Sequence, residues 1–540
     1  MVVKGPRTGA ALLVETLVEN GVKHVFSLSG NQILPIYDAT IGRDIDIIHT
    51  RHEATAVHMA DAWGRLTEEP GIAVVTAGPG HFNALSPLYM ASMAESPLVL
   101  LSGHAPIAQL GMGAFQEVDQ VAGARPVTKA AWMVREAANL GRDLQRAMQI
   151  AGEGRPGPVH LSLPDDILRQ VVEEGVDNSQ SGEEDGENLS GTDGGFPDVE
   201  KLLERISIAE RPLVLAGPAM TRGRRWQEVV DFASSTGAAV LPMGSPRGVN
   251  DPHLHLAVNK LAHADLVILA GKRLDFSLKF GQAPFASDCE FVQIGTDTAS
   301  HIDSMLSLSG IPEAILGEAA KIAREQEQAD RGGWAAAVSE ARSQTPEKWG
   351  QLRTSTAKPI HPLRICAAVQ PFLDEGAVFV SDGGEFGQWA QAGCEADTRI
   401  INGPSGSIGS ALPLALGTRT VHPDRHVFVF VGDGTFGFGA LELDTAVRYG
   451  LPITVVIGND ARWNAEVQLQ TNNYGADRIV ACELLPTRYD QVASALGAHG
   501  ERVEDPAELT PAIERALASG LPSCIDVVIE PAPAPSLLSN

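Results

Sequence analysis

The sequence has few cysteines, no long hydrophobic run and no excess of positive charge, and each of these absences excludes a class of protein. Its five cysteines are widely spaced in 540 residues and form neither a pairable disulfide framework nor a metal-binding pattern, so we expect a reducing compartment, the cytoplasm. No apolar run approaches the length of a membrane span. A formal net charge of −26 disfavours nucleic acids and anionic membranes as partners.

What is present is apolar content sufficient for several cores. Hydrophobic residues make up 44% of the chain, and the length predicts about three to four domains. Near the amino terminus, Glu15 and Glu19 interrupt apolar positions at helical spacing. That segment therefore reads as an amphipathic helix and not as a secretion signal.

Residues 1–177 alternate strand-like runs with helical stretches at 53–66 and 83–94, which predicts a parallel sheet covered by helices. The strand-like runs are Val22–Leu28, Ile72–Thr76, Leu98–Ser102 and Val159–Leu163. Residues 178–196 are acidic and rich in Gly and Ser, so we expect a linker there.

Residues 197–345 repeat the rhythm and predict a second α/β domain. Its helix around Glu313–Ala329 starts at Pro312, and a polar stretch follows to about Lys358, with a linker at 346–358. Its strand-like runs are Leu213–Ala216, Ala239–Leu241, Leu266–Ala270 and Phe291–Ile294. A third α/β domain is expected at 359–531, followed by a tail at 532–540.

The most specific motif is Gly432-Asp433-Gly434, which follows the apolar run Val427–Val431. A helical stretch and a second apolar run, Ile453–Ile457, lead to Asn459-Asp460. Strand, helix and strand form a βαβ unit, whose ligands gather beyond the carboxyl ends of the strands. A carboxylate in a glycine turn suits a divalent cation that bridges to phosphate, and Asp460, 27 positions after Asp433, offers a second oxygen ligand.

In this motif the chain resembles the thiamine diphosphate-dependent enzymes. The resemblance implies thiamine diphosphate and Mg²⁺ as cofactors, with a metal shell of Asp433, Asp460 and the backbone carbonyl of Arg462. Asp460 stands where the family usually has Asn, and its added charge should tighten the metal. The resemblance also implies three parallel-sheet domains: pyrimidine-binding, central Rossmann-like and diphosphate-binding. Further cofactor contacts are expected at Gly432, Gly434, Thr435 and Trp463.

Several residues outside the motif match the family's cofactor contacts. Glu53 matches a glutamate that hydrogen-bonds the aminopyrimidine ring and so favours removal of the C2 proton; alternatively it is an ordinary glutamate in a first helical turn. Gly80 and Asn83 match the loop against the pyrimidine, although Asn83 is also suited to capping a helix. Ile408 matches the apolar wedge under the cofactor, or is a core isoleucine. Gly384 and Glu385 match the loop on the cofactor's other side.

Three residues are candidates for contact with the substrate. Gln116 lies in a segment that resembles acetohydroxyacid synthases and benzaldehyde lyase, where a glutamine faces the substrate and can hydrogen-bond a developing alkoxide; the alternative is a surface-loop glutamine. Gln32 lies where relatives vary the residue that meets the substrate. Glu466 is either an acid or base at the substrate or an exposed helix residue. His81 and His104 titrate in a useful range, but histidines in turns are more often structural.

The family reaction adds a thiazolium ylid to a carbonyl, breaks a carbon–carbon bond and forms an enamine. Trp463 and Glu466 resemble 2-hydroxyacyl-CoA lyases, and 271–276 resembles the lyase and oxalyl-CoA decarboxylase pattern, whereas the first domain is closer to the synthases. We therefore expect a lyase or carboligase. The alternatives are an acetolactate synthase-like decarboxylase and carboligase, or a catalytically silent relative that binds the cofactor.

The resemblance also implies partners. Because Glu53 and Asp433 belong to different domains, the family pairs two chains around each cofactor, so we expect a homodimer or homotetramer acting on a small-molecule substrate. Relatives bind FAD, the ADP part of coenzyme A or nothing in the central domain. The basic stretch Arg222–Arg225 suits phosphate, or is a solvated helix start.

Overall fold

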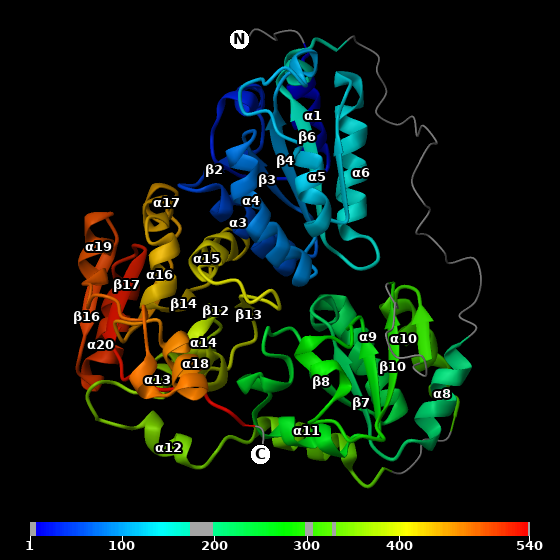
Figure 1. Ribbon diagram of the computed structural model, residues 1–540, viewed down its shortest axis with the longest axis vertical. Helices are drawn as coiled ribbons and strands as arrows, with labels where there is room; N and C mark the ends of the chain where they lie inside the picture. The colour runs from blue at the N-terminus through cyan, green and yellow to red at the C-terminus, as the bar shows by residue number, and fades with distance from the viewer. Residues whose placement is uncertain (1–6, 173–197, 297–305, 327–330, 538–540) are drawn as a thin grey trace. The chain divides into compact units, whose positions relative to one another are not determined.

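The computed structural model describes residues 7–172, 198–296, 306–326 and 331–537, so the expected linker at 178–196 lies outside the described residues (Figure 1). The chain divides into two compact units. The first unit holds residues 1–187 with 412–424 and 439–453, and the second unit holds the rest. Three parallel sheets confirm the predicted α/β class. Within the described ranges, no helix is long and apolar enough to cross a membrane.

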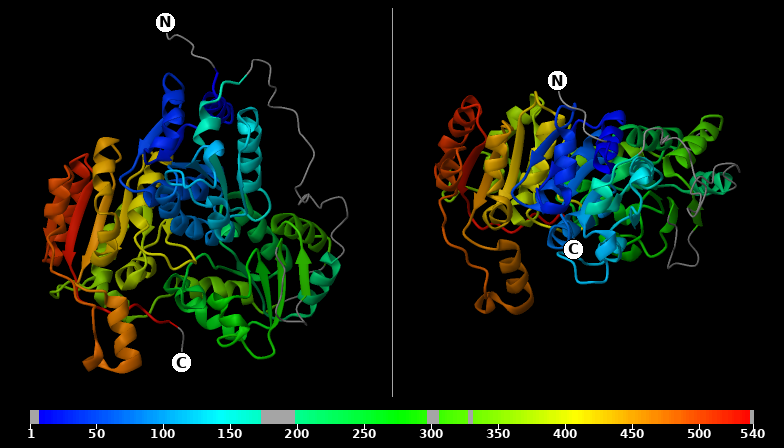
Figure 2. Two further views of the ribbon diagram at one scale, coloured as in Figure 1. Left: turned by 45° about the horizontal axis from the view of Figure 1, so that its top comes forward. Right: turned by 90° about the horizontal axis from the view of Figure 1, so that it is seen from above.

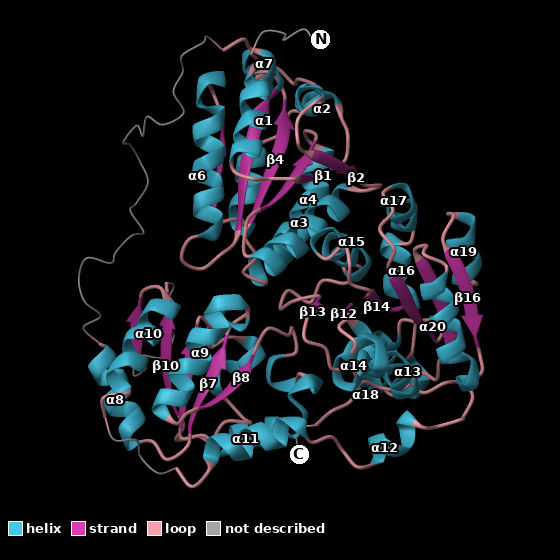
Figure 3. Ribbon diagram, turned by 180° about the vertical axis from the view of Figure 1, so that it is seen from behind, coloured by secondary structure: helices cyan, strands magenta, loops and turns pink. Residues whose placement is uncertain are grey.

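The sheet of the first unit has six parallel strands in the order β2-β1-β3-β4-β6-β5. Its strands are β1 (His24–Ser27), β2 (Asp46–His49), β3 (Gly71–Val75), β4 (Leu98–His104), β5 (Ala130–Met133) and β6 (Pro158–Pro164). Side chains alternate between its faces: Ile72 and Val74 join the core under helices α1 (Gly9–Glu19) and α6 (Leu140–Gly152). Helices α3 (Glu53–Thr67) and α4 (Pro79–Met93) follow β2 and β3 along the chain (Figure 3).

The second sheet has five strands in the order β11-β10-β9-β7-β8 and belongs to the second unit. Its strands are β7 (Pro212–Ala216), β8 (Ala239–Pro242), β9 (Leu266–Ala270), β10 (Glu290–Gly295) and β11 (Leu306–Ser309). Alternation again separates two cores: Val214 and Ile268 pack with α8 (Val199–Ile208), α9 (Gly223–Thr236) and α10 (Pro312–Ala323). Leu213 and Leu269 pack with η7 (Pro252–His263) and α11 (Trp334–Ser343).

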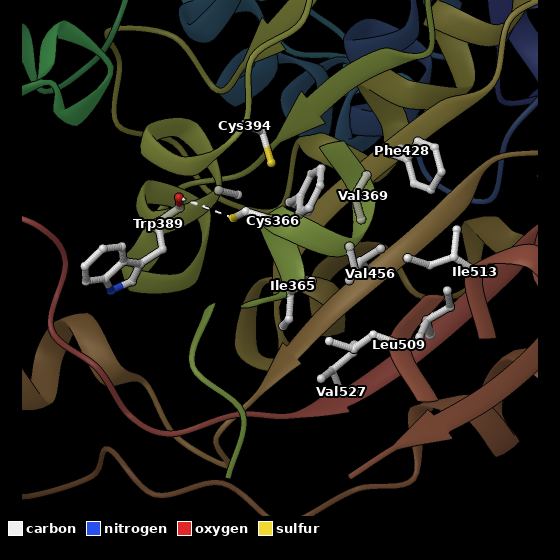
Figure 4. Packing of buried hydrophobic residues seen from close by; sticks show 14 of the residues in the cluster. Ile365, Cys366, Val369, Trp389, Cys394, Phe428, Val456, Leu509, Ile513 and Val527 are labelled. Atoms are coloured by element: carbon white, nitrogen blue, oxygen red, sulfur yellow. Dashed lines mark hydrogen bonds between the residues drawn. The ribbon is translucent and has the colours of Figure 1, made fainter. Parts of the chain in front are cut away.

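The third sheet, also in the second unit, has the order β13-β12-β14-β15-β17-β16. Its strands are β12 (Val378–Ser381), β13 (Arg399–Ile401), β14 (Val427–Gly432), β15 (Thr454–Asn459), β16 (His499–Val503) and β17 (Ser523–Val528). One face packs on α13 (Pro362–Asp374), α14 (Gly384–Gly393) and α20 (Leu509–Ala518). Figure 4 shows this core, in which the thiol of Cys366 donates to the carbonyl of Trp389.

The region between the second and third sheets departs from the prediction. Helix α10 starts at Pro312 as expected but ends at Ala323, because the apolar periodicity that buries it stops there. The predicted polar stretch contains two further helices, α11 and α12 (Lys348–Arg353). Both bury a tryptophan, Trp334 and Trp349, and these anchors outweigh the polar composition of their surroundings.

Candidate active site

Strands β14 and β15 place the two predicted metal carboxylates at one sheet edge. They are parallel neighbours, with Gly432 opposite Gly458, so Asp433 and Asp460 both follow the carboxyl ends of adjacent strands. Asp433 begins helix α16 (Asp433–Gly439) directly, without the intervening turn that the sequence suggested. Both residues line a cavity of about 120 Å³ together with Thr435. The expected βαβ arrangement is therefore present.

The electrostatics of this pair suit a cation. Burial raises the pKa of Asp433 to about 6, although nearby backbone N–H groups oppose the shift. Burial and then the charge of Asp433 raise the pKa of Asp460 to about 7. The buried Oδ2 of Asp433 has no hydrogen-bond partner among the described residues. An unpartnered carboxylate oxygen beside a second carboxylate is a donor set that Mg²⁺ prefers, so these residues fit the expected ion.

The segment that follows Asp460 is held in an unusual conformation. Ala461 has a positive φ of 56°, and its carbonyl accepts the N–H of Leu484 at 2.7 Å. The N–H of Trp463 donates to the carbonyl of Cys482 at 2.7 Å. A β-carbon on Gly434 would lie 2.6 Å from the Trp463 ring, so only glycine lets that ring lie over the start of α16. Trp463 and Glu466 line the cavity, and Figure 2 shows the following helix, α18 (Asn464–Tyr474), projecting from the sheet.

Asp382 joins the two loops that carry the remaining cofactor candidates of the second unit. Its buried carboxylate accepts the N–H groups of Gly383 at 2.8 Å, Gly409 at 3.1 Å and Ala411 at 2.9 Å. One loop leads into Gly384 and Glu385, and the other carries Ile408; all three line the same cavity. The sequence analysis did not single out Asp382. An acidic residue directly after a buried strand was the available signal.

On the pyrimidine side, the structure brings Glu53, Asn83 and Gly80 together. Glu53 is the first residue of α3 and 8% exposed, and its Oε2 accepts the side-chain amide of Asn83 at 3.0 Å. A β-carbon on Gly80 would lie 3.3 Å from Glu53 Oε1. Helix α4 starts at Pro79, so Asn83 lies inside it and the suggestion that Asn83 caps the helix is wrong. Asn83 orients Glu53 instead.

Two further hydrogen bonds hold the segment that precedes Glu53. Helix α17 (Glu442–Arg448) belongs to the first unit, and the carboxylate of Glu442 accepts the N–H of Arg51 at 3.1 Å. The hydroxyl of Tyr449 accepts the N–H of His49 at 2.8 Å. These partners lie almost 400 positions apart in the sequence. No local pattern reveals such contacts, so sequence reasoning missed Glu442 and Tyr449.

The two glutamine candidates both contact the segment around the pyrimidine loop. The Oε1 of Gln32 accepts the hydroxyl of Thr76 at 2.6 Å. Gln116 has a φ of 60°, and its backbone oxygen would lie 2.9 Å from a β-carbon on Gly78. The neighbouring Gln120, which the sequence did not single out, accepts the N–H of Gly78 at 2.9 Å and is 1% exposed.

The two histidines are structural, as the sequence favoured. His81 is buried, its Nδ1 lies 2.9 Å from the Ser102 hydroxyl, and burial lowers its pKa to about 4. It is therefore neutral at physiological pH. Both ring nitrogens of His104 lie about 3 Å from backbone carbonyls, of Ala105 and Val118.

The remaining candidates are Glu466 and the basic stretch Arg222–Arg225. Glu466 is exposed on α18 and also lines the cavity. In the basic stretch, Arg225 pairs with Glu313 at 3.0 Å, and Arg224 lies 3.7 Å from Glu228. These carboxylates neutralise part of the charge that a phosphate would need. The pyrimidine-side candidates lie in the first unit and the metal-side candidates in the second.

Comparisons with known protein families match three separate parts of the chain. Three models of the thiamine pyrophosphate enzymes match it: the N-terminal TPP binding domain at residues 7–122, the central domain at 199–316 and the C-terminal TPP binding domain at 382–527. Each match overlaps one of the three parallel sheets: 7–122 contains β1–β4, 199–316 contains β7–β11, and 382–527 contains β13–β16 and most of β17.

Curated relatives align over nearly the full length. The "Acetolactate synthase large subunit IlvG" of Mycobacterium tuberculosis is 33% identical over 546 residues, covering 98% of this chain and 97% of the relative. The "2-hydroxyacyl-CoA lyase 2" of Danio rerio is 31% identical over 566 residues, covering 95% and 90%. The human protein of that name is 30% identical, covering 92% and 85%.

Proposed function

Since the chain belongs to the thiamine pyrophosphate enzymes and is a thiamine diphosphate-dependent lyase or carboligase, we propose that it prefers to cleave or form the carbon–carbon bond of an extended 2-hydroxyacyl substrate. The observation that supports this preference is a cavity of about 600 Å³ beside the cofactor candidates. Gly384, Glu385 and Ile408 line the part of this cavity that would hold the cofactor, and the remaining part, which extends to Arg247 and helix α18, suits a ligand larger than a small 2-oxo acid.

Each candidate residue has a role in this proposal. Asp433, Asp460 and the Arg462 carbonyl would hold Mg²⁺, and Gly432, Gly434 and Thr435 would hold the diphosphate. Thiamine diphosphate supplies a nucleophilic carbon and an electron sink when bound. Ile408 supports the cofactor from below, and Gly384, Glu385 and Trp463 surround it.

On the pyrimidine side, Glu53 holds a proton at the aminopyrimidine ring, and Asn83 keeps its carboxyl group oriented. Gly80 allows the ring to approach. Gln116 and Gln32 stabilise charge that develops on the substrate oxygen. Glu466 exchanges protons with the substrate at the cavity.

The direct test compares substrates. Purified protein with thiamine diphosphate and Mg²⁺ should release aldehyde from a 2-hydroxyacyl-CoA faster than it forms acetolactate from pyruvate. The reverse ranking would favour the second candidate, an acetolactate synthase-like activity, which is supported by the relatives of that name covering 98% of the chain. Cofactor binding without any exchange of its C2 proton would identify a silent relative.

We also propose a homodimer or homotetramer that completes each site with Glu53 of one chain and Asp433 of another. Exposed Phe82, at 46%, and Phe115, at 70%, lie near the pyrimidine loop and support burial by a second chain. Mixing Glu53→Ala chains with Asp433→Ala chains should restore part of the activity. Absence of recovery after verified subunit exchange would contradict shared sites.

We also predict the location of the protein and a nucleotide site in its central domain. A cytoplasmic location is supported by the five cysteines, which are all free thiols. The candidate ligands of the central domain are FAD and the ADP part of coenzyme A, and incubation with each nucleotide followed by mass measurement would identify which one binds.

A further inference from the structure

A second cavity adjoins the cofactor site in the second unit. It measures about 600 Å³ and shares Gly383, Gly384, Glu385, Ile408 and Ala465 with the smaller cavity that holds the metal carboxylates. Its other walls come from the 246–251 turn of the central region, helix α18 and the 533–537 segment. A substrate in this cavity therefore reaches Ile408, which is one of the proposed cofactor contacts.

The lining of this cavity is rich in side-chain amides and poor in positive charge. Among the described residues that line it, Arg247 is the single cation. Two carboxylates line it as well, and each already accepts a backbone N–H: Asp251 from His253 at 3.0 Å and Glu385 from Ala534 at 2.8 Å. Amides bind neutral and charged groups alike, and backbone N–H groups already donate to the two carboxylates, so Arg247 is the lining side chain that would attract an anion.

The guanidinium of Arg247 is available for a ligand. It forms no hydrogen bond or ion pair with any described residue, although Glu385 and Asp251 lie close enough to attract it. A guanidinium carries five N–H donors and no acceptor, in a planar fork that matches a carboxylate or a phosphate. An unpaired fork that lines a substrate-sized cavity is thus suited to an oxyanion.

The backbone around Arg247 is held firmly, so its position is defined. Its N–H donates to the Ser245 hydroxyl at 3.2 Å, and its carbonyl accepts the N–H of Asn250 at 2.9 Å. Gly248 has a φ of 52°, and a β-carbon there would lie 2.0 Å from the Ser277 carbonyl oxygen. Only glycine fits at this position, because a β-carbon would overlap the Ser277 carbonyl.

We propose that Arg247 binds an oxyanion of the substrate, a carboxylate or a phosphate, and so selects anionic substrates for the adjoining cofactor site. This inference rests on the proposed function, because it takes the larger cavity as the substrate site. It adds the specificity-determining residue and the charge of the ligand. The two oxyanions share the same fork geometry and are separated by the choice of probe.

The test measures binding to the holoenzyme, so that it does not depend on turnover. Oxamate serves as the carboxylate probe and adenosine 3′,5′-bisphosphate as the phosphate probe, titrated by calorimetry into wild type, Arg247→Gln and Arg247→Lys. We expect at least one probe to bind wild type and to bind Arg247→Gln about 10- to 100-fold more weakly, because charge-assisted hydrogen bonds are lost. Arg247→Lys should recover only part of the affinity, since it cannot present a fork.

The matched control is Arg169→Gln, a surface arginine paired with Asp165 in the first unit, which should bind both probes as wild type does. Weakening for oxamate alone identifies a carboxylate, and weakening for the bisphosphate alone identifies a phosphate. If neither probe binds wild type, or Arg247→Gln binds as wild type does, the proposal is overturned.

Kinetics give a second readout. The ratio of kcat/KM for an anionic substrate to that for neutral benzoin should fall about 10- to 100-fold in Arg247→Gln, mainly through KM. Equal losses on both substrates would contradict the assignment. Absence of all turnover would count against the proposed function, while the calorimetric result would still decide the role of Arg247.

Discussion

Asp382 offers the sharpest test of how the second unit builds its cofactor site. Replacing it with asparagine preserves size but turns one acceptor into an N–H₂ donor. Asp382 Oδ2 accepts one backbone N–H, from Ala411, and Oδ1 accepts two, from Gly383 and Gly409. Whichever way the amide turns, at least one bond is lost and two donors face each other in a buried site.

The magnitude follows from the loss of one hydrogen bond to a charged acceptor, about 1.5–3 kcal/mol. That energy corresponds to about 10- to 150-fold in an equilibrium constant. The loss should appear as a lower free energy of unfolding or as weaker thiamine diphosphate binding, because Asp382 joins the loops of Gly384 and Ile408.

The assay follows tryptophan fluorescence, since Trp463 lines the site. Cofactor titration and urea unfolding would be measured on the same samples, with exposed Asp374→Asn as the control. If Asp382→Asn matches wild type in both affinity and stability, the two loops do not depend on this carboxylate, and the reasoning is refuted.

Three further predictions concern the metal site and the first unit. Gly434→Ala should weaken Mg²⁺ and cofactor binding at least about tenfold, because its β-carbon would lie 2.6 Å from the Trp463 ring. The control is Gly437→Ala in the same helix, whose β-carbon would have no neighbour within 4 Å and which should bind normally. Calorimetry would compare the two variants. EDTA should release the cofactor and Mg²⁺ should restore it, while Asp433→Asn should need more Mg²⁺ in the same titration; cofactor retention without metal would contradict the ligand set. Burial lowers the pKa of His58 to about 4, so between about pH 6.5 and 4 only the unfolded chain takes up this proton, and the free energy of unfolding falls as the pH falls. His58→Gln should reduce the loss of unfolding free energy between pH 7 and 5 by about 2 kcal/mol, measured by urea unfolding. An unchanged loss in the variant would refute this prediction.

Local patterns predicted the elements that position the site. Apolar runs predicted the strands that carry it, such as β14 and β15, because this signal depends on residues close together in the sequence. The glycine turn expected after β14 is instead the start of helix α16. The parallel pairing of β14 with β15 agrees with the predicted βαβ unit. These features needed no knowledge of distant contacts.

Sequence patterns did not predict the long-range contacts. The bond from Arg51 to Glu442 and that from Asp382 to Ala411 join segments that no periodicity connects. The unpaired state of Arg247 depends on which carboxylates find other donors, and that is a property of packing. Helices α11 and α12 were missed because one buried tryptophan in each outweighs a polar composition.

The central claim is that Glu53 activates a cofactor held through Asp433 and Asp460. Exchange of the C2 proton of bound thiamine diphosphate for deuterium, followed by NMR after rapid acid quench, measures that activation directly. Wild type should exchange about 10²- to 10⁴-fold faster than Glu53→Gln, with the exposed Glu69→Gln as control. Equal exchange rates in Glu53→Gln and wild type, at full cofactor occupancy, would contradict the account.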